Sequence, residues 1–442
     1  MKRIYLSSDN EKTAIGIAAA VIIALIVDME LSNIADIPNT GFASGIGIIA
    51  FIVISVIYLS GQHLILRFAK AKTTEFRSRR KGIKFIDIVV FTMESIIVSI
   101  FVLVILEILL GGYYGMVALP ITITVSNGLA AWIMFNLSKR LYVYYKSHKD
   151  LTILSYLFSG IINGAAAVLS ICLMVPIVLT KDSIITSTTP VVVHSFSPGS
   201  PLEILSYAYY ILTVVTFVSV WISTVLLLSV YSKKMGKMKF WLVICLPLIF
   251  YISQILIFVL KIAFPTGDSQ SIAFIFYYRV IFTVSSTLGG ILFALPFILI
   301  SKRITKQNIM HHQLIIFGLG MALFFVSGSA TVIHAPFPPF GLATVAVAGI
   351  SSYLLFLGLY SSAISLSEDS TLRKQIRKSA EDSKFFLKLS DAEIEKKIID
   401  QVEGVKLSMT TDSGIAPSIS IEEAKDYLGE VLKEMKKGGG SS

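Results

Sequence analysis

Charged residues are scarce in this 442-residue sequence, in which Asp, Glu, Lys and Arg together make up only 15% of the chain. Water-soluble domains usually contain about 25% charged residues. Hydrophobic residues make up 55% of the chain, and the mean hydropathy is +0.78. Apolar runs recur along the first 366 positions, and a run of about 20 residues is long enough to cross a bilayer. The sequence therefore predicts an all-α, polytopic bundle of membrane-spanning helices.

Cysteine and catalytic motifs are also scarce. The two cysteines, Cys172 and Cys245, fall inside predicted spans at opposite depths, so we expect neither a disulfide nor a Cys/His metal site. The chain has no phosphate-binding Gly loop, zinc-binding helix pair, nucleophile elbow or kinase signature. We therefore expect no catalytic residue, no bound metal and no cofactor.

Basic residues are concentrated in short segments between apolar runs. Residues 67–84 contain eight Lys and Arg residues and one acid, Glu75. Loops this basic stay on the cytoplasmic side of the cell membrane, and alternation from this loop orients every other span. Both termini are then cytoplasmic. The ten predicted spans are residues 13–31, 44–67, 85–110, 118–138, 151–180, 203–231, 240–263, 272–301, 313–333 and 342–366.

The net charge of +10 does not indicate a nucleic-acid partner. Residues 1–366 hold 25 Lys and Arg against 13 Asp and Glu, whereas the remainder of the chain holds 13 against 15. The positive excess therefore lies in the loops of the bundle, where orientation and contact with anionic lipid headgroups explain it. The expected partner is the lipid bilayer, and no nucleic acid is expected.

Ionisable residues within the spans are the candidate functional residues, because a charge facing lipid is costly. Asp87 lies near the inner boundary of the third span, level with His63 of the second span. Glu107 lies near the outer boundary, level with Lys261 and Arg279. Two interpretations stay open for these groups. They either form part of a proton, ion or ligand path, or they are polar contacts that hold the helices together.

Glu94 is the deepest of these groups. It lies about 13 Å from the basic end of its helix, and no cation is predicted at the same depth. We therefore expect its carboxyl group to be protonated, or hydrogen-bonded to a Ser, Thr, Asn or Tyr side chain.

Residues 367–437 are predicted to form a short helical tail in the cytoplasm. Its last helix, residues 421–435, carries one apolar stripe that is expected to dock on a cytoplasmic loop or on another protein. The stripe consists of Leu428, Val431, Leu432 and Met435. Association between copies of the chain also stays open. Residues 438–442 resemble a flexible end or an expression scar.

The most distinctive segment joins the last span to the tail. It contains Pro336-Phe-Pro-Pro-Phe-Gly341, Ser351-Ser-Tyr353, Gly358-Leu-Tyr-Ser-Ser362, Ser367-Glu-Asp-Ser370 and Leu372-Arg-Lys374. Over about 45 residues this segment resembles uncharacterised polytopic membrane proteins of ammonia-oxidising archaea and the membrane-sensor half of some archaeal histidine kinases. No phospho-accepting or ATP-binding region follows it. The resemblance implies a sensor or signalling scaffold in an archaeal cytoplasmic membrane.

Two main classes of function are compatible with the sequence. In the first, the bundle is a sensor or scaffold that passes a movement through the last span to the tail. In the second, the ten spans enclose the midplane site of a proton-coupled or cation-coupled transporter that uses Glu94 and Arg279. A membrane enzyme or a subunit of a larger complex is a third alternative.

Overall fold

The protein is a helical bundle in a computed structural model that describes residues 8–35, 45–72, 81–180, 182–187, 199–229, 236–248, 291–302, 309–327, 335–360 and 427. Seven helices in these residues are long and apolar enough to cross a membrane. They are α1 (Ser8–Ala35), α2 (Gly45–Lys72), α4 (Lys81–Gly111), α5 (Ala118–His148), α6 (Leu151–Leu179), α7 (Pro201–Ser229) and the helix Leu342–Tyr360, which we name the central helix. Two shorter apolar helices are Ile291–Ser301 and α11 (Ile309–Ser327).

This architecture confirms the all-α bundle and its multi-pass character. The number of spans stays a prediction, because the predicted spans 240–263 and 272–301 fall largely outside the described residues. The tail beyond residue 360 lies outside them as well, apart from Tyr427.

The hairpin between α5 and α6 shows how local chemistry sets helix ends. Lys149 adopts a left-handed backbone (φ 46°), and its N–H donates to Tyr145 O at 2.8 Å. The Asp150 carboxylate then accepts from Thr152 N at 2.8 Å and caps the start of α6. The helix α5 therefore continues ten residues beyond the predicted end of the fourth span at residue 138, to His148.

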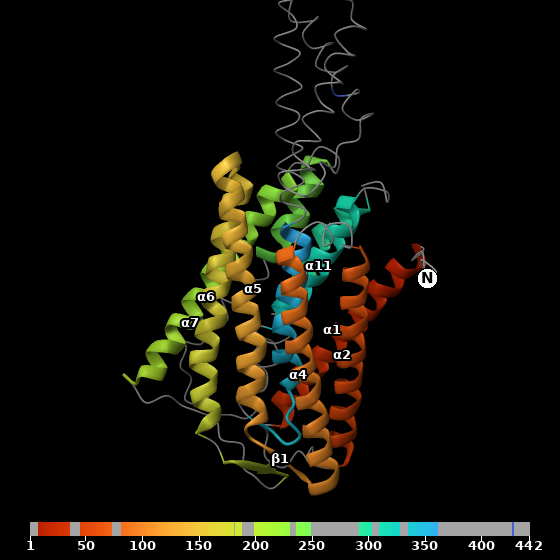
Figure 1. The fold of residues 1–442 in the computed structure, drawn as a ribbon, viewed down its shortest axis with the longest axis vertical. Helices are drawn as coiled ribbons and strands as arrows, with labels where there is room; N and C mark the ends of the chain where they lie inside the picture. Colours follow the sequence, from red (N-terminus) through yellow and green to blue (C-terminus); the bar gives the residue numbers. More distant parts are fainter. Residues whose placement is uncertain are drawn as a thin grey trace, which may run out of the picture.

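A short sheet lies at one end of the bundle (Figure 1). The segment after α4 contains strand β1 (Tyr113–Gly115), which pairs antiparallel with β2 (Ile184–Thr186). Gly112, at φ +68°, turns the chain from α4 into β1. Neither strand was predicted, because a three-residue strand has no sequence pattern of its own and depends on a distant partner.

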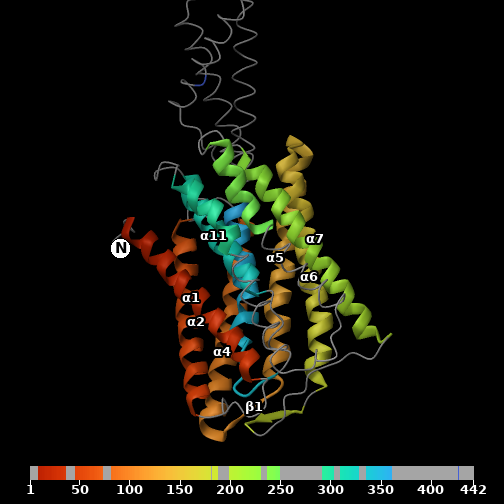
Figure 2. The same ribbon diagram turned by 180° about the vertical axis from the view of Figure 1, so that it is seen from behind.

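The central helix runs through the middle of the bundle and is surrounded by other helices in both views (Figures 1 and 2). Every residue from Leu342 to Tyr360 is buried. A helix that is buried on all sides belongs to the core of its bundle. By contrast, α4 exposes a broad apolar face that includes Phe91 and Leu103, as a lipid-facing helix does.

Small residues let the backbones approach each other closely. A Cβ atom on Gly358 of the central helix would lie 2.6 Å from the backbone nitrogen of Phe317 on α11. A Cβ atom on Gly160 of α6 would clash with the Ser138 hydroxyl of α5. Close packing of this kind is a main source of helix association in membranes.

The contact at Gly358 predicts a difference between two glycine substitutions. Gly358→Ala should lower the free energy of unfolding by about 1–3 kcal/mol, because the new methyl group meets backbone atoms that cannot move aside. Gly128→Ala on α5 is the matched control, because its Cβ would meet nothing within 4 Å. Thermal unfolding of the detergent-purified protein measures both. Equal melting temperatures for the two variants would contradict close packing of the central helix against α11.

Candidate functional site

The N-terminal end of the central helix is held by a carboxylate. Asp28 of α1 is fully buried, and its Oδ2 accepts from the backbone N of Thr344 at 3.2 Å and from the Thr344 hydroxyl at 3.0 Å. The first backbone N–H groups of a helix have no partner within the helix, and an acidic group near them is stabilising. Asp28 therefore acts as an N-terminal cap supplied by a different helix.

The segment that leads into the central helix is fixed by Tyr114 of β1. Its hydroxyl donates to Pro336 O at 3.2 Å, and its ring stacks on Phe337 with 6.4 Å between the centroids. Burial raises the pKa of the Tyr114 hydroxyl, which therefore remains a neutral donor. The small sheet and the start of the central helix are thus joined at the same end of the bundle.

Further along, two more polar contacts bind the central helix. Tyr353 donates its hydroxyl hydrogen bond to Asp87 Oδ1 of α4, and both side chains are buried. The Ser126 hydroxyl of α5 lies 2.8 Å from Val345 O and accepts from Gly349 N at 3.1 Å. The central helix is therefore hydrogen-bonded to α1, α4 and α5.

At its other end, the central helix contacts a cation. The guanidinium group of Arg140 on α5 lies 5.7 Å from the Phe356 ring centroid and 6.0 Å from that of Tyr360. The two rings stack on each other at 5.7 Å. Cation–π contacts of this kind are attractive, so Arg140 fixes the end of the helix from which the chain continues.

Glu94 belongs to a group of four buried oxygen-bearing side chains. Gln62 of α2 donates its amide hydrogen bond to Glu94 Oε2. Tyr58, one turn away on α2, packs its ring on Phe101 of α4 at 5.5 Å. The Tyr58 hydroxyl also lies within electrostatic range of the carboxyl groups of Glu94 and Asp28.

This group, which we name the oxygen cluster, consists of Asp28, Tyr58, Gln62 and Glu94. Each member has a buried oxygen atom that lacks a hydrogen-bond partner in the described part of the chain: Asp28 Oδ1, Tyr58 OH, Gln62 Oε1 and Glu94 Oε1. Buried polar atoms are nearly always paired in folded proteins. Four exceptions among neighbouring side chains therefore require an explanation.

The structure places the predicted candidate residues in different environments. Glu94 and Asp87 are buried, and the partner of Glu94 is Gln62, a residue type that the sequence prediction did not include. Glu107 is half-buried and accepts from Gly115 N at 2.8 Å, which ties β1 to the end of α4. His63 is exposed on α2 and lies apart from the oxygen cluster.

The remaining candidates lie outside the described residues. They are Lys261, Arg279, Leu428, Val431, Leu432 and Met435. Among the residues that the structure does describe, no three His, Cys, Asp or Glu side chains come together in a group that could hold a metal ion.

Sequence reasoning did not select four of the residues that form the contacts described above, namely Asp28, Tyr58, Gln62 and Tyr353. Asp28 lies near the end of the predicted span 13–31, where a polar residue attracts no attention. Tyr58 and Gln62 are four residues apart in an apolar helix, a spacing that places both side chains on one face. That pairing of polar residues was the available signal.

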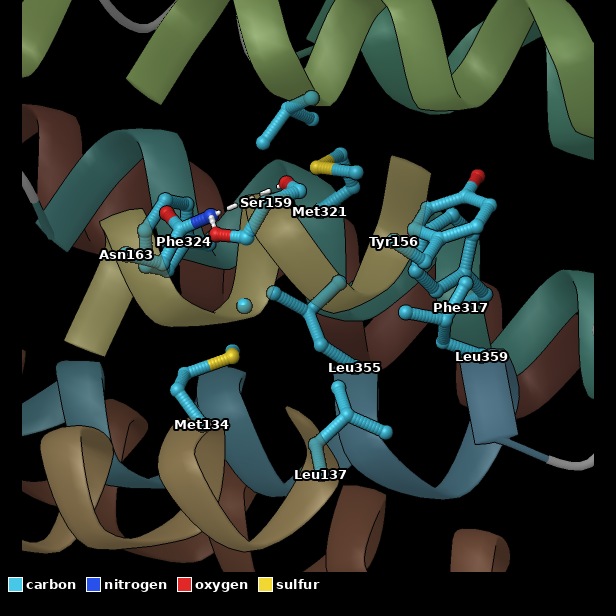
Figure 3. Close-up of a pocket in the computed structure, with 12 residues that line it drawn as sticks. Met134, Leu137, Tyr156, Ser159, Asn163, Phe317, Met321, Phe324, Leu355 and Leu359 are labelled. Carbon is cyan, nitrogen blue, oxygen red and sulfur yellow. Dashed lines mark hydrogen bonds between the residues drawn. The ribbon is translucent and has the colours of Figure 1, made fainter. Parts of the chain in front are cut away.

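A separate small cavity lies between α5, α6, α7, α11 and the central helix (Figure 3). Its volume is about 20 Å³, which has room for about one water molecule. Most of its lining is apolar, and Asn163 points toward Ser159, whose backbone oxygen accepts from Asn163 Nδ2 at 2.7 Å. This cavity is too small to hold a solute.

No protein-family model, curated protein or solved structure matches this chain.

The contact between Tyr353 and Asp87 predicts a loss of stability. Tyr353→Phe removes a donor from a buried carboxyl group and should cost about 1–3 kcal/mol of unfolding free energy. The exposed Tyr142 supplies the control Tyr142→Phe, which should have little effect. In an Asp87→Asn background the cost of Tyr353→Phe should shrink, because the two residues interact. An undiminished cost in that background would contradict the assigned contact.

Proposed function

We propose that this chain is an integral membrane sensor or signalling scaffold, in which the central helix couples the bundle to the chain that follows Tyr360. The observation that carries this proposal is the set of contacts along the central helix. Asp28 binds its first turn, Asp87 binds Tyr353, and Arg140 covers Tyr360 at its last turn. A change at any of these contacts acts on the whole helix, because a helix moves as a rigid element.

The nature of the contacts supports a switch. Two of the three involve carboxyl groups, whose hydrogen bonds and charge change on protonation or on ion binding. A signal that alters Asp28 would change how strongly the first turn of the central helix is held. Such a signal shifts the population of bundle conformations if its affinity differs between them.

The segment beyond Tyr360 supplies the proposed output. The basic loops favour a cytoplasmic location for this end of the bundle. The resemblance to archaeal sensor segments, over about 45 residues, rests on stretches that begin at Pro336 and so includes the central helix. We propose on this basis that the chain is related to those sensors and that the cytoplasmic tail passes the signal to a partner.

Hydrogen exchange tests the coupling. Asp28→Asn removes the charge that caps the central helix and should raise the exchange rate in residues 361–442 by roughly fivefold or more, the range of ordinary allosteric coupling. Glu203→Gln is the control, since the Glu203 carboxyl group accepts from Gly199 N at the start of α7. An effect of Asp28→Asn that stays within the residues around Thr344 would contradict the proposed coupling.

A transporter is the second candidate, favoured by the carboxyl groups of Asp28, Glu94 and Asp87, which are all buried in the bundle. Proton relays in membrane proteins often use such groups. Proton and Na⁺ flux in liposomes containing wild-type protein or Glu94→Gln separates the two functions. The sensor proposal predicts no flux above empty liposomes. Robust wild-type flux that disappears in Glu94→Gln would replace the sensor with a transporter.

A further inference from the structure

Three members of the oxygen cluster, Tyr58, Gln62 and Glu94, have no part in the contacts of the central helix described above. Gln62 and Tyr58 occupy one face of α2, and Glu94 faces them from α4. Gln62 Nε2 donates to one carboxyl oxygen of Glu94, so the amide holds the carboxyl group in place. The second oxygen of Glu94, the amide oxygen of Gln62 and the Tyr58 hydroxyl have no hydrogen-bond partner among the described residues.

These atoms are shielded from solvent. Tyr58 is 0% exposed, Gln62 is 4% exposed and Glu94 is 5% exposed. A buried oxygen without a partner loses its hydration and gains nothing in return, which costs about 1–3 kcal/mol. Three such atoms on facing helices are tolerated if a species between them supplies positive charge or a donor.

The charges around the cluster favour a positive species. The Asp28 carboxyl group adds a second acid within electrostatic range of Tyr58. Lys70 of α2 is within electrostatic range of Glu94, but lies about two turns beyond Gln62 and holds its ammonium group 5.9 Å from the Phe91 ring centroid. One carboxylate together with one monovalent cation gives a neutral pair, which a membrane interior tolerates far better than a lone charge.

The donor atoms decide which cation fits. Carboxylate, amide and phenol oxygens are hard ligands and suit alkali or alkaline-earth ions, whereas transition metals prefer the nitrogen and sulfur atoms of His and Cys. We propose that Glu94, Gln62 and Tyr58 form a binding site for a monovalent alkali cation of the Na⁺ type. The binding of the ion does not depend on the proposed sensor function, whereas the role of the ion as a signal does.

A thermal-shift titration tests the site in the full-length protein. NaCl replaces N-methylglucamine chloride at constant pH and ionic strength, with wild type, Glu94→Gln and Glu107→Gln compared side by side. The wild-type melting temperature should rise with Na⁺ by roughly 2 °C or more, because a ligand that binds the folded state stabilises it. Glu94→Gln should not respond, and Glu107→Gln, whose carboxyl group lies outside the cluster, should respond like wild type.

A milder variant and a direct measurement complete the test. Tyr58→Phe removes one oxygen ligand and should raise the half-maximal Na⁺ concentration about tenfold. Calorimetric titration of the wild type with NaCl detects binding even if Glu94→Gln fails to fold.

Three results would overturn the site. The wild-type melting temperature could change with pH but not with Na⁺, the melting temperature of Glu94→Gln could rise with Na⁺ as much as that of the wild type, or calorimetry could detect no Na⁺ binding. Na⁺ binding without any change in the hydrogen exchange of residues 361–442 would support the site and remove its proposed role as a signal.

Discussion

The burial of the central helix on every side is the constraint on which the rest of the structure depends. Lipid offers no hydrogen bonds, so a polar group in the interior of the bundle must find its partner within its own helix or on a neighbouring helix. The side chains of Thr344 and Tyr353 therefore require Asp28 and Asp87 at matching positions. Glycines such as Gly358 allow the backbones to approach closely enough for these bonds to form.

Much of the fold could be predicted, because its signals are local. A long apolar run marks a span wherever it occurs, and α6 (Leu151–Leu179) agrees with the predicted span 151–180 to within one residue. Features that depend on distant partners could not be read from the sequence. The strands β1 and β2 stabilise each other across the two intervening helices α5 and α6, and the left-handed Lys149 sets the true end of α5.

For the candidate site, the sequence indicated the burial of the charged residues but not their partners. The cost of exposing charge to lipid correctly predicted that Asp87 and Glu94 face the interior. The depth of a residue along its helix does not define how that helix is rotated or tilted against its neighbours. The partner of Asp87 is Tyr353, which lies 266 residues away in the sequence. Uncharged polar residues such as Tyr58 and Gln62 have little effect on hydropathy, so only the structure brought them together with Glu94.

Lipid-accessibility labelling tests the central position of the helix most directly. A lipid-soluble carbene reagent, activated by light in a reconstituted bilayer and mapped by mass spectrometry, modifies residues that face the acyl chains. The exposed face of α4, including Phe91 and Leu103, should be labelled strongly, while the segment Leu342–Tyr360 should remain unlabelled along its whole length. Labelling of the central helix at every third or fourth residue would show that it has a lipid-facing side, and would contradict its burial in the middle of the bundle.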